Sequence, residues 1–391
     1  MTGRILTKFI ALALTGILLL SGCARNSGDS SGMSEWEKAA KLNAHETADE
    51  LYEAAKAEDV LTVYTVSSRV FDVVESFQAR YPGLLVEATY YRAEEIKDKL
   101  YEAKANGQAG CDLIFTTNGD GNLTQDLIPD HLAYKYIPYD IEDKMRKGGS
   151  SEYVSVLLEA PLLAYNYEVY TDGAPLKNWW ELTGPEWKGK LYVTDPSKSN
   201  ISYTVFSMLI SNKDMLEEAY LEHFGTKYSA QNGESAGECL IRKLVENDMH
   251  VLNDSDDVAN AVAAPGTGAD GIGLLNASKL RLNDRGYTLE NITDMKPFAG
   301  VINPANIMIV GGAKNVNCAK LFIRWMLGET DGEGEGYTPF LGVGAWPARE
   351  DVTRGDSRNL NNLNVIYTDE KYTAENREAF LNMWSGLIDR K

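Results

Sequence analysis

The segment LYVTDPSKSNISYTVFS, residues 191–207, predicts a buried strand, a short polar loop and the beginning of a helix. Apolar residues at 191–193 form the strand, Asp195 and Pro196 end it, and an apolar helix is expected over 203–210. The first N–H groups of a helix have no intrahelical partner and lie at the positive end of its dipole, so this segment is suited to hold an anion. The alternative is that Ser199 or Ser202 only caps the helix.

The first half of the chain repeats this strand, turn and helix pattern. Strands are expected over residues 60–65, 84–90 and 111–116, with helices over 70–80 and 94–104 between them. Polar residues follow the strand ends, namely Ser67, Ser68 and Arg69, then Arg92, then Thr117 and Asn118. Because the strands of such a unit end at one edge of the sheet, these side chains are expected to line a small-ligand crevice. Ser67 and Ser68 as simple helix caps are the alternative.

Two long apolar segments, residues 154–166 and 296–310, are longer than single strands need to be. They predict crossings between two lobes, and a body of more than 350 residues also exceeds the usual size of one core. We therefore expect an α/β protein with two lobes and a ligand cleft between them.

The N-terminus carries Arg4 and Lys8, a 12-residue apolar run over residues 9–20, and the sequence LSGC ending at Cys23. The run is too short to span a bilayer, so residues 1–22 are interpreted as a signal peptide. The LSGC ending resembles the lipobox of bacterial lipoproteins, which implies cleavage before Cys23 and attachment of lipid to its sulfur. Residues 23–45 are then a flexible linker rich in Gly and Ser, and the body is anchored at the outer face of a membrane.

The formal net charge is −19, and loss of Arg4 and Lys8 with the leader would make it −21 (−19 − 2). An acidic body argues against nucleic acid as a partner, although a locally positive pocket still binds an anion. Cys111, Cys239 and Cys318 are odd in number and lack CxxC spacing, so neither a zinc site nor more than one disulfide is expected. No metal, cofactor or catalytic group is predicted, and the protein is expected to be a monomeric binding protein.

Several segments resemble the extracytoplasmic solute-binding proteins of ABC importers, in the branch that binds ferric iron, sugar phosphates and aminoalkylphosphonates. The match is carried by WWELTGPEWKGKLYVTDPSKS (179–199), LTVYTVSSR (61–69), YPGLLVEATY (81–90), EAPLLAYN (159–166), GAKNVNCAKLFIRWML (312–327) and WPARED (346–351). The resemblance implies a type II periplasmic-binding fold and an ABC permease as partner. Lobe one would comprise residues 58–159 and 299–328, and lobe two residues 160–298 and 329–391.

Iron-binding members of this branch hold ferric ion with a tyrosine pair after the strand that matches residues 271–275. Here that position reads Asn276-Ala277-Ser278-Lys279, without tyrosine. Neutral donors and arginines favour a phosphorylated or phosphonate solute. Iron is the second candidate, with Tyr90, Tyr91 and Tyr203 as its ligands.

The predicted ligand-binding residues fall into three groups. Ser197, Ser199, Asn200 and the helix start at Tyr203 are expected to hold the anionic group. Ser67, Ser68, Thr117, Asn118, Asn276 and Asn303 are expected to contact it or the organic portion, and Arg69 or Arg92 to balance its charge.

Overall fold

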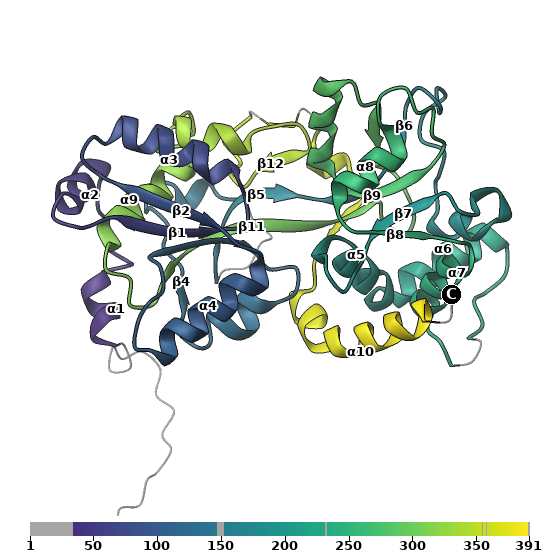
Figure 1. Cartoon of the computed structure of the whole chain (residues 1–391), viewed down its shortest axis with the longest axis horizontal. Coiled ribbons are helices and arrows are strands. Elements are labelled where there is room, and N and C mark those ends of the chain that lie inside the picture. Colours follow the sequence, from purple (N-terminus) through teal and green to yellow (C-terminus); the bar gives the residue numbers. More distant parts are fainter. Residues whose placement is uncertain (1–33, 147–151, 231–232, 354, 357, 390–391) are drawn as a thin grey trace, which may run out of the picture.

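The computed structural model describes residues 34–146, 152–230, 233–353, 355–356 and 358–389, and its two α/β lobes lie side by side (Figure 1). Each lobe has a sheet covered by helices, and long strands run between the two sheets. The predicted α/β architecture with two lobes is confirmed.

Lobe one is built on β1, which pairs in parallel with β2 on one side and β3 on the other. Leu61 and Val63 of β1 are fully buried against Phe77 of α3 and Phe322 of α9, so alternate residues of the strand face the core. The elements of this lobe are α2 (Ala48–Ala55), β1 (Leu61–Thr65), α3 (Arg69–Arg80), β2 (Val86–Tyr90), α4 (Ala93–Ala105), β3 (Leu113–Thr117), η2 (Leu123–Leu127), β4 (Ala133–Tyr134), η3 (Glu142–Lys144) and α9 (Val316–Met326).

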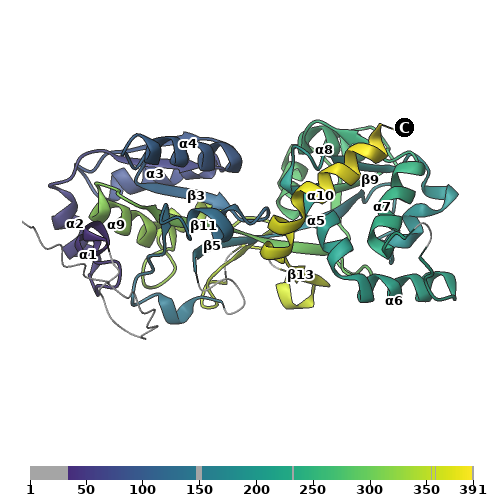
Figure 2. The ribbon, with the colours of Figure 1, turned by 90° about the horizontal axis from the view of Figure 1, so that it is seen from below.

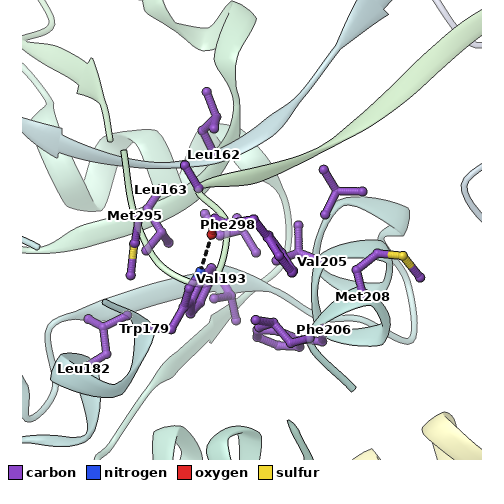
Figure 3. Packing of buried hydrophobic residues seen from close by; sticks show 14 of the residues in the cluster. Leu162, Leu163, Trp179, Leu182, Val193, Val205, Phe206, Met208, Met295 and Phe298 are labelled. Carbon is purple, nitrogen blue, oxygen red and sulfur yellow. Dashed lines mark hydrogen bonds between the residues drawn. The ribbon is translucent and has the colours of Figure 1, made fainter. Parts of the chain in front are cut away.

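Lobe two contains the segment quoted first, as β7 followed by α5. Trp179 is fully buried, and its indole Nε1 donates to the carbonyl of Phe298, 3.0 Å away, beside Phe206 of α5 (Figure 3). The polar end of the indole is thus satisfied inside an apolar core. The elements are β6 (Pro161–Asn166), η4 (Trp179–Thr183), η5 (Pro185–Trp187), β7 (Leu191–Thr194), α5 (Asn200–Ser211), α6 (Lys213–Phe224), α7 (Ala236–Glu246), β8 (His250–Leu252), α8 (Ser255–Ala263), β9 (Ile272–Asn276), η6 (Ala277–Arg285) and β10 (Leu289–Asn291).

Both predicted crossings are present. The first is β5 (Val154–Glu159), which pairs in the lobe-one sheet and continues through Ala160 into β6. The second is β11 (Gly300–Val310), which begins beside β6 and β13 (Val365–Tyr367) and ends beside β3 and β4. Two extended segments therefore connect the lobes at the floor of the space between them.

The C-terminal tail departs from the prediction that residues 329–391 belong to lobe two. Helix η7 (Glu335–Phe340) buries its aromatic side chains in the lobe-one core, and β12 (Ala345–Pro347) pairs with β5. The chain then passes η8 (Leu360–Asn362) and β13, and α10 (Glu370–Ile388) packs on lobe two (Figure 2). The tail therefore begins in lobe one and passes once to lobe two, because its apolar residues fit two different cores.

The predicted linker, residues 23–45, is also partly wrong. Helix α1 (Glu35–Ala40) has a capping box between Ser34 and Glu37, and Trp36 Nε1 donates to the carbonyl of Ala313. The signal peptide, Cys23 and the Gly/Ser segment up to residue 33 lie outside the described residues.

The three cysteines of the described residues, Cys111, Cys239 and Cys318, are buried free thiols. Burial raises the pKa of the Cys111 thiol, so this sulfur is held protonated and unreactive. None of the helices in the described part of the chain has the length and apolar character needed to cross a membrane.

Candidate functional site

A cleft of about 750 Å³ lies between the lobes, at the ends of the strands. Its floor contains Glu159 of β5 and Asn303 of β11, and its walls come from the loops and helix starts that follow β1, β2, β3, β7 and β9. Nine predicted site residues line it: Ser67, Ser68, Arg69, Arg92, Thr117, Ser197, Asn200, Asn276 and Asn303. The convergence of strand ends that the sequence indicated is therefore realised.

The other three predicted residues do not line the cleft. The Asn118 side chain is buried and accepts from the N–H of Leu123 at 2.7 Å, so it shapes the turn after β3. Tyr203 is fully buried, and its hydroxyl donates to the carbonyl of Thr373 on α10. Ser199 is the N-cap of α5, without a side-chain capping bond. Tyr203 is covered by α10, where its ring packs edge-on against Phe380.

The start of α5 supplies its own anions. The Asp195 carboxylate accepts from the N–H and hydroxyl of Ser197, at 3.0 and 2.8 Å, and from the indole of Trp384. Burial pushes the pKa of Asp195 up, but these hydrogen bonds outweigh it and lower the pKa overall. The donors of Ser197 are therefore already used.

A second carboxylate reaches the same helix from lobe one. Asp120 is buried, and its Oδ2 accepts from Asn200 Nδ2 at 3.2 Å and from Asn122 Nδ2 at 2.7 Å. Burial raises the pKa of Asp120 above its usual range. Asn200 thus makes a hydrogen bond between the lobes in addition to lining the cleft.

The opposite end of the cleft is formed by η6 and the start of α8. Lys279 donates to the carboxylate of Asp256, and this charge-assisted contact lowers the pKa of Asp256. Arg281 Nη1 donates to the carbonyl of Ser278 at 3.0 Å, while the Arg281 side chain remains exposed to the cleft. The predicted residue Asn276 lies just before them, at the end of β9.

Arg69 faces this end from lobe one. Its Nη2 lies 3.2 Å from Oε1 of Glu159, which leaves other guanidinium donors without a partner among the described residues. Asn303 lies beside Glu159 across the β5–β11 pair, and its Oδ1 is buried with no hydrogen-bond partner in the described chain. A buried acceptor of this kind is favourable only when a ligand or water donates to it.

Arg377 of the C-terminal helix also lines the cleft, although no pattern around it in the sequence indicates a site. Its Nη2 pairs with Glu94 of α4, and its guanidinium lies 4.9 Å from the ring centre of Tyr203. One helix thereby contacts both lobes beside the cleft.

The cleft lining is positive, in contrast with the acidic chain. Six cations line it, and three carboxylates oppose them. The cations are Arg69, Arg92, Lys198, Lys279, Arg281 and Arg377; the carboxylates are Glu94, Glu159 and Asp256. The sequence analysis did not predict Lys279 and Arg281 as lining residues, although they follow Asn276 closely in sequence. Charges directly after a strand end were the available signal.

The donor set fits a metal ion poorly. The described residues contain no group of three His, Cys, Asp or Glu side chains able to hold a metal. The three tyrosines proposed for iron do not converge: Tyr90 lines the cleft, Tyr91 packs against Tyr64, and Tyr203 is buried. Each lining carboxylate is already paired with a cation.

The fold is that of periplasmic substrate-binding proteins of ABC transporters. Iron-bound HitA from Pseudomonas aeruginosa has a TM-score of 0.64 and 16% identity, over 84% of this chain and 99% of HitA. AfuA from Actinobacillus pleuropneumoniae, with fructose 6-phosphate bound, has a TM-score of 0.62 and 19% identity, over 85% of this chain and 99% of AfuA.

Apo ferric ion-binding protein A from Pasteurella haemolytica has a TM-score of 0.63 and 14% identity, over 84% of this chain and 97% of that protein. No protein-family model and no curated protein matches the sequence. At these identities the similarity establishes the fold and leaves the ligand open, because neighbours with iron and with a sugar phosphate have the same architecture.

Proposed function

We propose that this protein is the solute-binding component of an ABC importer and captures a small anionic solute, a phosphorylated organic compound or a phosphonate. The observation that carries the proposal is the surplus of cations in the interlobe cleft, six against three carboxylates, in a chain whose formal charge is −19. A local excess of this kind, against the charge of the whole chain, favours an anionic ligand.

The connections between the lobes support trapping by closure. Only extended segments, β5–β6 and β11, and the C-terminal tail pass between the lobes in the described chain. Rotation about such segments closes two lobes on a ligand and changes the outer surface that a permease recognises. The predicted residues Ser67, Ser68, Thr117 and Asn276 would then contact the ligand from opposing walls, with Arg92 balancing charge.

Location and anchoring follow from the N-terminal sequence. Residues 1–22 would direct export, and lipid on Cys23 would hold the body at the outer face of a membrane. The proposed partners are the solute and the permease, with the protein acting as a monomer. We assign binding and not catalysis, since the solved neighbours with this fold are binding proteins of transporters.

Ferric ion is the second candidate because iron-bound HitA has the same fold. An iron site needs anionic oxygen ligands, and the cleft offers carboxylates only as partners of its own cations. Binding of iron would therefore require breaking these pairs, which an anion does not.

Calorimetric titration of residues 24–391 with fructose 6-phosphate, 2-aminoethylphosphonate and ferric citrate tests the proposal. We expect saturable 1:1 binding of at least one phosphorus compound and no binding of ferric ion supplied with a non-binding chelator. A tight coloured 1:1 iron complex, with no response to either phosphorus compound, would establish the iron alternative instead.

A further inference from the structure

One end of the cleft holds a cluster that we name the basic corner: Arg69, Lys279 and Arg281, with the carboxylates Glu159 and Asp256. Arg285 also acts electrostatically on Arg281, although it does not line the cleft. Counting Arg285, four cations oppose two carboxylates, which leaves a local charge of +2 (4 − 2). The rest of the lining has three cations, Arg92, Lys198 and Arg377, against Glu94. The carboxylates of Asp195 and Asp120 lie beside these cations without lining the cleft, and counting them, as Arg285 is counted, leaves no surplus there (3 − 3 = 0).

The two arginines of the corner come from different lobes. Arg69 is the first residue of α3, and Arg281 belongs to η6 after β9. Desolvation and then the charge of Arg69 lower the pKa of Arg281, so the two guanidinium groups act on each other across the cleft. Glu159, on the floor of the cleft, forms an ion pair with Arg69, and its charge raises the pKa of Arg281.

The donors of these arginines are mostly unused. Arg69 contacts Glu159 through Nη2, and Arg281 contacts only Ser278, through Nη1, among the described residues. A guanidinium has five N–H donors in a planar fork that matches the oxygens of a phosphate group. The start of α5 differs, because Asp195 and Asp120 already occupy the side chains of Ser197 and Asn200.

We propose that Arg69 and Arg281 clamp a doubly charged phosphate or phosphonate group between the lobes, and that the local charge of +2 makes binding selective for dianions. This inference rests on the proposed function and moves the anionic group from the start of α5 to the basic corner. Closure of the lobes without a ligand brings the cations of the basic corner closer together, which is unfavourable. A bound dianion cancels their net charge of +2. A monoanion leaves the corner at +1, and a ferric ion raises its charge.

Matched pairs of ligands with equal shape and different charge test this selectivity. The pairs are fructose 6-phosphate with fructose 6-sulfate, and 2-aminoethylphosphonate with 2-aminoethanesulfonate, titrated calorimetrically at pH 8, where phosphorus groups carry about two charges. We expect the phosphorus compound of the responding pair to bind at least tenfold more tightly. Arg281→Gln and Arg69→Gln should each reduce that ratio by about tenfold, the usual size of a lost charge-assisted hydrogen bond.

Two further variants separate charge from folding. Glu159→Gln removes a carboxylate and frees Arg69, so it should strengthen binding of the phosphorus compound severalfold; mere structural damage would weaken it. Lys188→Gln, at a surface cation that pairs with Asp248 and does not line the cleft, is the control, with an expected change of less than threefold.

The outcomes distinguish the two proposals. If the wild type binds a phosphorus compound but the phosphate-to-sulfate ratio is unchanged in Arg281→Gln and Arg69→Gln, the clamp is wrong and the solute-binding function stands. A wild type that binds a sulfate or sulfonate as tightly as its partner also overturns dianion selectivity. If neither member of either pair binds, the proposed anionic ligand fails together with the clamp.

Discussion

The two ends of the cleft have similar polar and charged residue types, but they differ in whether the side-chain hydrogen-bond donors already have partners within the protein. At the start of α5, serine, lysine and asparagine side chains follow a strand, but Asp195 and Asp120 accept hydrogen bonds from Ser197 and Asn200, and Asp195 pairs with Lys198. At the basic corner, Arg69 and Arg281 also follow strand ends, yet most of their donors have no partner in the described chain. If the anion binds at the basic corner, as we propose, a polar turn indicates a ligand site only when its donors are not used internally.

The physical reason is that folding itself satisfies polar groups. Buried donors and acceptors are almost always paired within a native structure, so a serine-rich turn usually finds an acceptor of its own. Guanidinium groups in excess over carboxylates cannot be satisfied in this way. A surplus of cations over carboxylates is therefore a better indicator of an anion-binding site than a polar turn.

The largest expected effect compares matched lysines at the two ends. Lys279 and Lys198 both line the cleft and both pair with an aspartate, Asp256 and Asp195 respectively. Lys279→Glu should weaken binding of the responding phosphorus compound by about 100-fold, roughly 2.7 kcal/mol, because it reverses a charge whose side chain is only 12% exposed.

Lys198→Glu should change the affinity less than fivefold, since its side chain is 67% exposed and water screens it. Calorimetric titration of both variants at low and at moderate salt measures the difference. Equal losses in the two variants would show that the anion lies between the ends of the cleft and not at the basic corner.

The sequence predicted much of the scaffold because the signals were local. The strands at β1, β3 and β7 are short apolar segments followed by polar turns, and the two crossings are unusually long apolar segments. The same patterns located nine of the twelve predicted residues on the cleft.

The misses depended on tertiary packing. Arg377 lies on a helix that reaches the cleft only because the tail crosses back to lobe two, and nothing near it in sequence indicates this. Tyr203 is buried under α10, and the Asn118 side chain accepts a hydrogen bond within its own turn. The segment around η7 belongs to lobe one because Tyr337 and Phe340 pack in the core of that lobe, and the local sequence does not show this.

A smaller effect concerns stability at the start of α5. Asp195→Asn removes the charge that accepts from Ser197 and Trp384, so it should lower the free energy of unfolding by about 1–2 kcal/mol at pH 7. Because the folded pKa of Asp195 is lowered, its contribution is present above the unfolded pKa and is lost as the pH falls through the folded value. Urea unfolding at pH 7 and pH 3 checks both statements. A loss of the same size at both pH values would mean that packing, and not charge, is what Asp195 contributes.

The smallest effect has the opposite sign, although it lies at the same helix. Burial raises the pKa of Asp120, so the folded state binds more protons than the unfolded state, and stability falls as the pH rises from the unfolded pKa through the folded one. Asp120→Asn keeps an acceptor oxygen for the side chains of Asn200 and Asn122, loses the longer hydrogen bond from the Asn122 N–H, and removes the buried charge. It should therefore raise the free energy of unfolding by about 0.5–1 kcal/mol at pH 7.5 and have little effect at pH 3.5. Urea unfolding of this variant beside Asp195→Asn measures the contrast. A destabilisation at pH 7.5 would show that Arg377, whose charge acts on Asp120, holds the carboxylate more strongly than burial opposes it.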